Sequence, residues 1–185
     1  MRAVPLLLLL AACAPDRPAP PPVPPPDPPR IASADTVDVQ GVSAVRATLA
    51  GAASGTVTLR AMEGGTRVLM TVDGLREDTY HGVQILSARS CEAADGSPHL
   101  GDGRATHGPY DAIRGRRHAG DLGNIRGDDR GRGRFDRIDP HVPLAGYLSA
   151  ANRAVVVREH QDDGVALPHG GSGGILACGV LSPIR

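Results

Sequence analysis

The chain has 185 residues, a length that suits one domain with appended segments. Its formal net charge is zero and all 20 basic residues are arginine, so bulk charge offers no argument for a nucleic acid or an anionic surface as partner. Aromatic residues make up only 2% of the chain, so the core must be built from Val, Leu, Ile and Ala. The 24 Gly and 17 Pro indicate many turns and a low-complexity segment.

Residues 1–12 read as an export signal, because a single arginine, a short leucine run and small residues precede Cys13. The Leu-Ala-Ala-Cys sequence at 10–13 resembles the bacterial lipobox, in which the cysteine is lipidated and becomes the mature N-terminus. The leucine run is too short to span a bilayer. The alternatives are an ordinary cleaved signal and a chance apolar start. We expect a lipid-anchored protein of the bacterial cell envelope. By resemblance to such lipoproteins, Ala14 is compatible with the periplasmic face of the outer membrane.

Residues 14–30 are dominated by proline, which locks φ and favours an extended, semi-rigid chain. At about 3.1 Å per residue this tract could hold a domain roughly 50 Å from its anchor. A ligand for a proline-recognising module is the alternative. We therefore assign residues 13–30 to the lipidated cysteine and its tether, and residues 31–185 to the folded domain.

From about Val37 onward the hydrophobic pattern changes to a period of two. Apolar and polar residues alternate on both sides of a Gly64-Gly65 turn, which predicts an antiparallel hairpin. Its inward-facing positions are Val57, Leu59, Ala61, Val68, Met70 and Val72. Further strand-like runs are 80–86, 133–138, 154–158 and 175–181. No run in this part has helical periodicity, so the sequence predicts an all-β sandwich or barrel.

Two long stretches, 87–124 and 159–174, carry no strand pattern, and loops of that length are commonly functional. The first is rich in Gly, Arg, Asp and Pro and contains three histidines and an aspartate with room to converge. These candidate metal ligands are His99, His107, His118 and Asp121. Three imidazoles and one carboxylate complete a tetrahedral shell for Zn²⁺. Ordinary loop histidines are the alternative interpretation.

With Cys13 assigned to the lipid anchor, Cys91 and Cys178 remain as an even pair in an exported protein. A bridge between them would pin the first loop to the body of the sheet. Closing such a loop contributes about 4–5 kcal/mol in the chain-entropy model. Free buried thiols are the alternative.

Several motifs occur in the order found in copper/zinc superoxide dismutases. They are His81-Gly82, Pro98-His99, His107-Gly108, the R-H-A-G-D-L-G-N run at 117–124 and the A-C-G-V run at 177–180. This resemblance covers roughly residues 44–181. It implies a Greek-key β-sandwich with two long loops. It also implies a Cys91–Cys178 disulfide.

The resemblance also assigns roles on the zinc side of the family's two-metal site. By motif position, the implied zinc ligands are His99, His107, His118 and Asp121. Asp162 resembles the family's carboxylate that hydrogen-bonds to a zinc-binding imidazole and fixes its orientation, with a surface turn residue as the alternative. His81 matches a family histidine that is structural and binds no metal.

The copper side departs from the family pattern. Where the family reads H-G-x-H-x-H, with the last two histidines on copper, this chain has Gln84 and Leu86. Another copper histidine of the family follows a V-V pair, and Arg158 stands there, a permanent cation with no lone pair to donate. Only His99, the family's bridging histidine, remains. In addition, Ile175 replaces the arginine that guides substrate in the family.

These departures decide the predicted cofactor and function. Dismutation needs a metal with an accessible redox couple, which copper has and zinc lacks. Copper also needs imidazole nitrogens that the replaced positions do not offer. We therefore expect zinc and no copper, and a zinc-stabilised, non-catalytic module that binds an unidentified envelope partner. The alternatives are superoxide dismutation through an unusual metal site and periplasmic zinc holding.

His160 and His169 could rebuild a copper site together with His99. However, a shift of two strand residues from Arg158 to His160 displaces a side chain by about 6.6 Å, so we interpret both histidines as solvated loop residues.

Arginines flank the zinc-type motif on both sides, interspersed with aspartates. They are Arg114, Arg116, Arg117, Arg126, Arg130, Arg132 and Arg134. We interpret them as solvated loop faces, with contact to lipid headgroups or glycans of the envelope as the alternative. No nucleic acid partner is expected outside the cytoplasm.

Overall fold

The computed structural model of the protein describes residues 42–101, 103, 106–112 and 116–184. The export signal, the lipidated cysteine and the tether predicted for residues 1–30 lie outside this part, as does Arg114. The chain divides into two units, residues 1–36 and 37–185, and all described residues belong to the second. A search of the described residues finds no helix with the length and apolarity needed to cross a bilayer.

The described part of the chain is built from β-strands, joined by turns and two long loops. The strands are β1 (Ala44–Gly51), β2 (Ser54–Met62), β3 (Gly65–Asp73), β4 (Tyr80–Leu86), β5 (Asp121–Arg126), β6 (Arg132–Asp139), β7 (Ala154–Arg158), β8 (Ile175–Val180) and β9 (Ser182–Pro183). The predicted hairpin is confirmed, since β2 and β3 pair antiparallel; its turn consists of Glu63 and Gly64, and Gly65 already belongs to β3, paired with Met62. Strands β4 and β7 have the predicted bounds, β6 is one residue longer than predicted at each end, and β8 is one residue shorter at its C-terminal end.

The inward-facing positions of the hairpin are buried as predicted, with one exception. Ala61 is exposed, although Val57 and Leu59 on the same strand are buried. Arg60 pairs with Ala44, the first residue of β1, so Ala61 lies just past the end of the neighbouring strand and of the core beneath it.

Three strands were not predicted, namely β1, β5 and the two-residue β9. Strand β1 alternates regularly but was not separated from the period-two pattern that begins near Val37. Strand β5 was assigned to the long loop, because Asp121, Gly123 and Asn124 belong to residue types that are depleted in strands. The first loop therefore ends at Gly120, and Asp121 belongs to the sheet.

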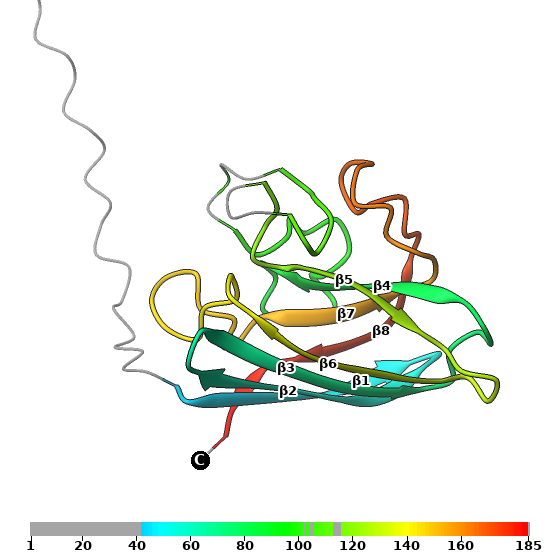
Figure 1. Cartoon of the computed structure of the whole chain (residues 1–185), viewed down its shortest axis with the longest axis horizontal. Helices are drawn as coiled ribbons and strands as arrows, with labels where there is room; N and C mark the ends of the chain where they lie inside the picture. Colours follow the sequence, from blue (N-terminus) through cyan, green and yellow to red (C-terminus); the bar gives the residue numbers. More distant parts are fainter. Residues whose placement is uncertain (1–41, 102, 104–105, 113–115, 185) are drawn as a thin grey trace, which may run out of the picture. The chain divides into compact units, whose positions relative to one another are not determined.

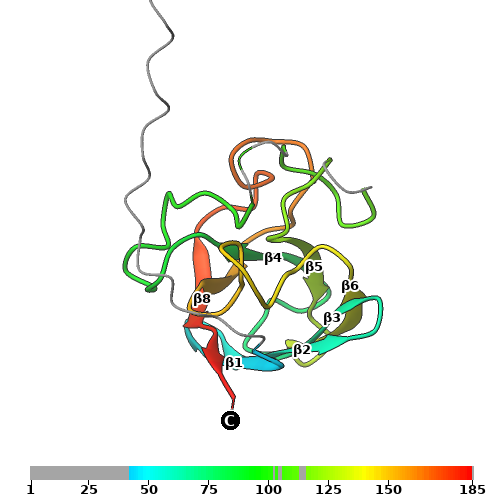
Figure 2. The same ribbon diagram turned by 90° about the vertical axis from the view of Figure 1, so that its left-hand side faces the viewer.

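The strands form two layers that are almost closed into a barrel (Figure 1). The hydrogen-bonded order is β5-β4-β7-β8-β1-β2-β3-β6, and every pair is antiparallel. Strand β1 joins the layers, because it pairs with β2 along most of its length and with β8 at Ala50 and Gly51. At the other side, β5 and β6 meet through a single Gly127–Gly133 bridge. The predicted all-β class with a Greek-key strand order is confirmed (Figure 2).

The space between the layers is filled mainly by aliphatic side chains, as the composition required. Phe135 is the one aromatic side chain in the principal core cluster. A second, smaller cluster lies on the other face of β4 and β7 and consists of Leu86, Ala88, Ala94, Ala154, Val156 and Cys178. This second cluster carries the start of the first long loop.

The predicted disulfide is confirmed: Cys91, in the first long loop, is bonded to Cys178 in β8, with their Cα atoms 5.8 Å apart. The two cysteines are 87 residues apart in the sequence. The bond therefore fastens the loop that carries the histidines to the middle of the sheet, beside Leu86.

We predict that the double variant Cys91→Ser/Cys178→Ser lowers the free energy of unfolding by about 4 kcal/mol, because the unfolded chain regains the freedom of a loop of this size. Urea titration of both proteins measures the difference. As a control, dithiothreitol should lower the free energy of unfolding of the wild type to that of the variant and leave that of the variant unchanged. A reduced wild type that keeps its full stability would contradict this account.

Candidate metal centre

Strand β4 positions the first long loop by backbone hydrogen bonds. Ile85 donates to the carbonyl of Gly120 at 2.9 Å and accepts from Leu100 at 2.8 Å, and His99 forms a β-bridge with Leu86. A Cβ on Gly120 would lie 2.0 Å from the carbonyl oxygen of Ile85, so only glycine allows this approach. As a result, both ends of the loop lie against the same strand.

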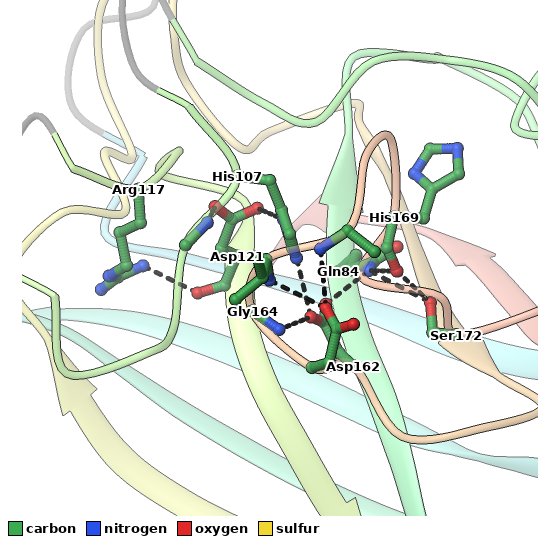
Figure 3. Close-up of polar contacts among 12 residues, drawn as sticks. Gln84, His107, Arg117, Asp121, Asp162, Gly164, His169 and Ser172 are labelled. Atoms are coloured by element: carbon green, nitrogen blue, oxygen red, sulfur yellow. Dashed lines mark hydrogen bonds and ion pairs between the residues drawn. The ribbon is translucent and has the colours of Figure 1, made fainter.

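This attachment brings the four predicted ligands together. One ligand atom from each of His99, His107, His118 and Asp121 lies within 4.8 Å of the others. All three rings direct Nδ1 towards the Asp121 carboxylate. The His107 and His118 Nδ1 atoms are 3.2 and 3.3 Å from its oxygens, and His99 Nδ1 contacts Oδ1 (Figure 3 shows His107 and Asp121).

The donor set fits a zinc ion. His118 Nδ1 is buried 3.3 Å from Asp121 Oδ2 but is poorly aligned with it for a hydrogen bond, so this nitrogen is available to a metal ion. Three imidazole nitrogens and one carboxylate match the tetrahedral ligand set of a closed zinc site. The four residues therefore form a cluster suited to Zn²⁺.

Asp121 is held as an ionised acceptor at the centre of this cluster. Its Oδ2 accepts backbone N–H bonds from Gly108 at 3.1 Å and from His118 at 2.8 Å. Burial raises the pKa of Asp121, but hydrogen bonds to the three histidines outweigh it and hold the pKa well below its usual range. The carboxylate is ready to bind a cation without losing a proton.

Arg117 was predicted to be solvated, and this prediction was wrong. Its side chain is buried and donates to the backbone carbonyl of Asp121 at 2.8 Å (Figure 3). Its Nη2 also donates to both carboxylate oxygens of Asp139 at 2.8 Å. Because Asp139 ends β6, 22 residues further along the chain, no local pattern indicated the pair. The pair braces the backbone of Asp121 against the opposite layer.

The other described arginines of these segments are exposed, as predicted. They are Arg116, Arg126, Arg130, Arg132 and Arg134.

Asp162 connects the second long loop to the cluster. It is buried and accepts hydrogen bonds from His107 Nε2 at 2.7 Å, Gln84 Nε2 at 2.7 Å and the Gly164 N–H at 2.8 Å (Figure 3). Burial raises the pKa of Asp162, but the hydrogen bonds from His107 and Gln84 outweigh burial, so the pKa lies below its usual value. Burial likewise lowers the pKa of His107, yet hydrogen bonds to Asp121 and Asp162 raise it to about 9.

The three positions that differ from the family's copper pattern are filled by packed side chains. Gln84 and Arg158 are both buried, and Arg158 Nε donates to Gln84 Oε1 at 2.9 Å. Arg158 also donates to the carbonyl of Gly173 at 3.2 Å. Leu86 lies in the apolar cluster beside the disulfide. A chain of hydrogen bonds therefore runs from Arg158 through Gln84 to Asp162.

Of the two histidines predicted to be solvated, only one is exposed. His160 is exposed, as predicted. His169 was predicted to be solvated, but it is half-buried and its Nδ1 lies 2.7 Å from His99 Nε2. Burial and the charge of Arg158 lower the pKa of His169 to about 4. A separation of 70 residues left no sequence signal for this contact. His81 is buried, with Nδ1 2.9 Å from the Arg158 carbonyl, in line with a structural role.

The fold and the cluster define a β-sandwich protein with a candidate metal site at the base of its long loops. Comparison with known proteins agrees. Residues 53–181 match the family model for copper/zinc superoxide dismutase. A superoxide dismutase (Cu-Zn) 2 of Brassica juncea is 38% identical over 128 residues, covering 64% of this chain and 82% of the relative. The chain belongs to the copper/zinc superoxide dismutase family.

A solved structure shows the same fold. The crystal structure of the clock protein EA4 superposes with a TM-score of 0.70 at 27% sequence identity. The match covers 77% of this chain and 95% of that one.

We predict that Gln84 and Arg158 are energetically coupled. Gln84→Leu and Arg158→Met should each lower the free energy of unfolding by about 3 kcal/mol, because each leaves a buried polar or charged group without its partner. The loss of unfolding free energy in the double variant should be smaller than the sum of the two single losses by about 1 kcal/mol or more. Urea denaturation measures all four proteins. Arg60→Ala, in the opposite layer, is the matched control. Its effect on the free energy of unfolding should add to that of Gln84→Leu.

We also predict that zinc binding at pH 7 releases about one proton from His107, because a metal-binding imidazole nitrogen must be deprotonated. The pKa of His107 is about 9, so the release should disappear at pH 10 and zinc affinity should rise as the pH increases towards 9. Calorimetry in buffers of different ionisation enthalpy counts the protons. Equal release at pH 7 and pH 10 would show that His107 is not the source.

Proposed function

We propose that the protein is a zinc-stabilised, non-catalytic member of its family, anchored in the bacterial cell envelope, where it binds a partner. The observation that supports this most strongly is the hydrogen-bonded Gln84–Arg158 pair at two of the family's copper positions. Its members bond to each other and to Asp162, so the site has been rebuilt around side chains that do not bind copper. The zinc-type cluster is complete at the same time.

The residues that would hold zinc come from two places in the fold. His99, His107 and His118 belong to the first long loop, and Asp121 begins β5. Zinc, when bound, supplies a redox-inert cross-link between loop and sheet. Gly108 and His118 orient the carboxylate through their N–H groups, and Asp162 orients the His107 ring. These contacts favour a metal with a structural task.

The donors on the copper side do not fit copper. Leu86 has no lone pair, and the guanidinium of Arg158 is a permanent cation that opposes a second one. The His99 nitrogen on that side faces His169. A dismutase centre built from these residues would lack the imidazole set that copper prefers.

Three features support an envelope location. The sequence at 10–13 resembles a lipobox, which would attach Cys13 to a membrane lipid. The proline tract is suited to a spacer between that anchor and the domain. The Cys91–Cys178 disulfide is typical of proteins in oxidising compartments. Periplasmic zinc holding is less favoured, because three of the four candidate ligands are buried, an arrangement poorly suited to ready uptake and release of an ion.

We predict that copper does not confer superoxide dismutase turnover on the zinc-loaded protein, since three of the family's copper positions offer no imidazole. Stopped-flow decay of superoxide during copper titration measures the activity, with an active copper/zinc superoxide dismutase as the positive control. Gln84→His/Leu86→His/Arg158→His restores the family's residues and should bind one more copper ion than the wild type. Copper-dependent turnover by the wild type would refute the non-catalytic assignment.

We predict that His107→Ala and Asp121→Ala abolish zinc binding and lower the melting temperature of the zinc-supplemented protein. Zinc at about 100 times its Kd contributes about 2.7 kcal/mol, which corresponds to roughly 5–10 °C in a domain of this size. Elemental analysis and calorimetry measure both effects. His160→Ala, on an exposed side chain, is the control. Unchanged zinc content and melting temperature in both ligand variants would rule out the zinc site.

A further inference from the structure

The contact between His99 and His169 has no counterpart in the sequence motifs. The two rings lie nearly parallel, with centroids 5.0 Å apart and an interplanar angle of 21°. His99 Nε2 and His169 Nδ1 are 2.7 Å apart, the distance of a short hydrogen bond. His99 Nδ1 contacts Asp121 on the other side of the ring. The His99 ring therefore has one nitrogen in the cluster and the other on the second long loop.

Without metal, Asp121 determines which nitrogen of His99 carries the proton. An ionised carboxylate only accepts hydrogen bonds, so His99 Nδ1 must be the protonated nitrogen. Two imidazole nitrogens at hydrogen-bond distance need one donor and one acceptor, so His99 Nε2, on a ring whose proton is on Nδ1, is the acceptor. The hydrogen bond then runs from His169 Nδ1–H to His99 Nε2.

With zinc bound, the same ring must be protonated the other way. A metal ion takes the Nδ1 lone pair of His99, so its single proton moves to Nε2. His99 Nε2–H can then only donate, and His169 must accept at Nδ1 and carry its own proton on Nε2. Each ring keeps one proton throughout, so the change requires no added acid or base.

We propose that zinc binding reverses the His99–His169 hydrogen bond, and that His169 is a positioning residue that holds His99 as a zinc ligand and links the metal site to loop 159–174. This inference rests on the proposed zinc site. Metal-binding histidines commonly donate their second ring N–H to a fixed acceptor, which orients the ring and raises its basicity. His169 Nδ1 is the acceptor that the structure provides.

The residues around His169 are arranged to keep it in this place. Gln84 Nε2 donates to the His169 backbone carbonyl at 3.2 Å, and the Ser172 hydroxyl donates to the same oxygen (Figure 3). The next residue, Gly170, has a φ of +65°, and a Cβ there would lie 2.0 Å from Asp162 Oδ1. Gln84 therefore supports both loop residues that contact the cluster, His169 and Asp162.

A second metal ion between the two rings is the competing explanation. The nitrogens are closer than two ligands facing each other across a metal ion. Moreover, Arg158 carries a positive charge near His169 and lowers its pKa, so the local field opposes a further cation. Gln84 and Ser172, which contact the His169 backbone carbonyl, are engaged with each other and with the loop backbone. The geometry therefore favours a hydrogen bond.

Nitrogen-15 NMR of histidine-labelled, disulfide-bonded protein tests the reversal directly. Long-range proton–nitrogen spectra identify which ring nitrogen is protonated. We expect His99 and His169 to carry the proton on Nδ1 after treatment with a chelator and on Nε2 after addition of one equivalent of zinc. A His169 ring that keeps Nδ1–H in the zinc-bound protein would overturn the proposal.

Variants at position 169 test the positioning role. His169→Ala should weaken zinc binding about 10–100-fold, as found for partners of metal-binding histidines. His169→Asn should recover most of this loss, because its amide oxygen can accept from His99 Nε2–H. Chelator competition measures the affinity, and hydrogen exchange of loop 159–174 in the zinc-bound state should be faster only in the alanine variant. His160→Ala, on the same loop, is the matched control.

The outcomes separate this inference from the proposed function. A wild type that binds no zinc would overturn both. A wild type that binds zinc while His169→Ala binds it equally well would overturn the positioning role alone. Loss of a second metal equivalent in His169→Ala would show that the pair is a metal site instead. Equal destabilisation of the zinc-free and zinc-bound forms would assign His169 a purely structural task.

Discussion

The carboxylate of Asp121 is the group on which the organisation of this protein depends. It begins β5 opposite Gln84, so its place is determined by the sheet. Three Nδ1 atoms converge on it from the first long loop. Backbone N–H groups and the Arg117–Asp139 pair hold this part of the chain in position. The loop is therefore ordered around a fixed negative charge, which is the requirement for selective binding of a cation.

At the family's copper positions this chain has packed side chains, and among the described residues Arg158 Nη2 is buried there without a hydrogen-bond partner. Gln84 offers both a donor and an acceptor, and it uses them on Asp162 and Arg158. A buried guanidinium is costly unless it is paired, and Gln84 together with the Gly173 carbonyl satisfies two of its nitrogens. Leu86 extends the apolar cluster over the disulfide. The side chains of Gln84, Arg158 and Leu86 are therefore mutually compatible, which would not be expected of three unrelated substitutions.

Local sequence patterns were sufficient to predict most of the fold and the candidate ligands. They were not sufficient to predict which residues hydrogen-bond to those ligands. The hairpin, β4 and β7 follow from alternation, and the ligand cluster from motif spacing. Strand β5 was missed because its Asp, Gly and Asn are poor strand formers that serve the site and the turn. The burial of Arg117 and the His99–His169 contact depend on partners 22 and 70 residues away. Such pairings are set by the meeting of loops in space, which a single sequence does not reveal.

His99 stands at the family's bridging position, so the partner of its second ring nitrogen matters for the metal cluster. An imidazole that binds a metal through Nδ1 keeps an N–H on Nε2, and a buried N–H without an acceptor costs free energy. With no copper ligands around it, that nitrogen needs a partner from the protein, and His169 is within 2.7 Å. Gln84 fixes the backbone of His169 and the carboxylate of Asp162 together. Gln84, at one of the family's copper positions, thereby supports two residues that contact the candidate metal cluster.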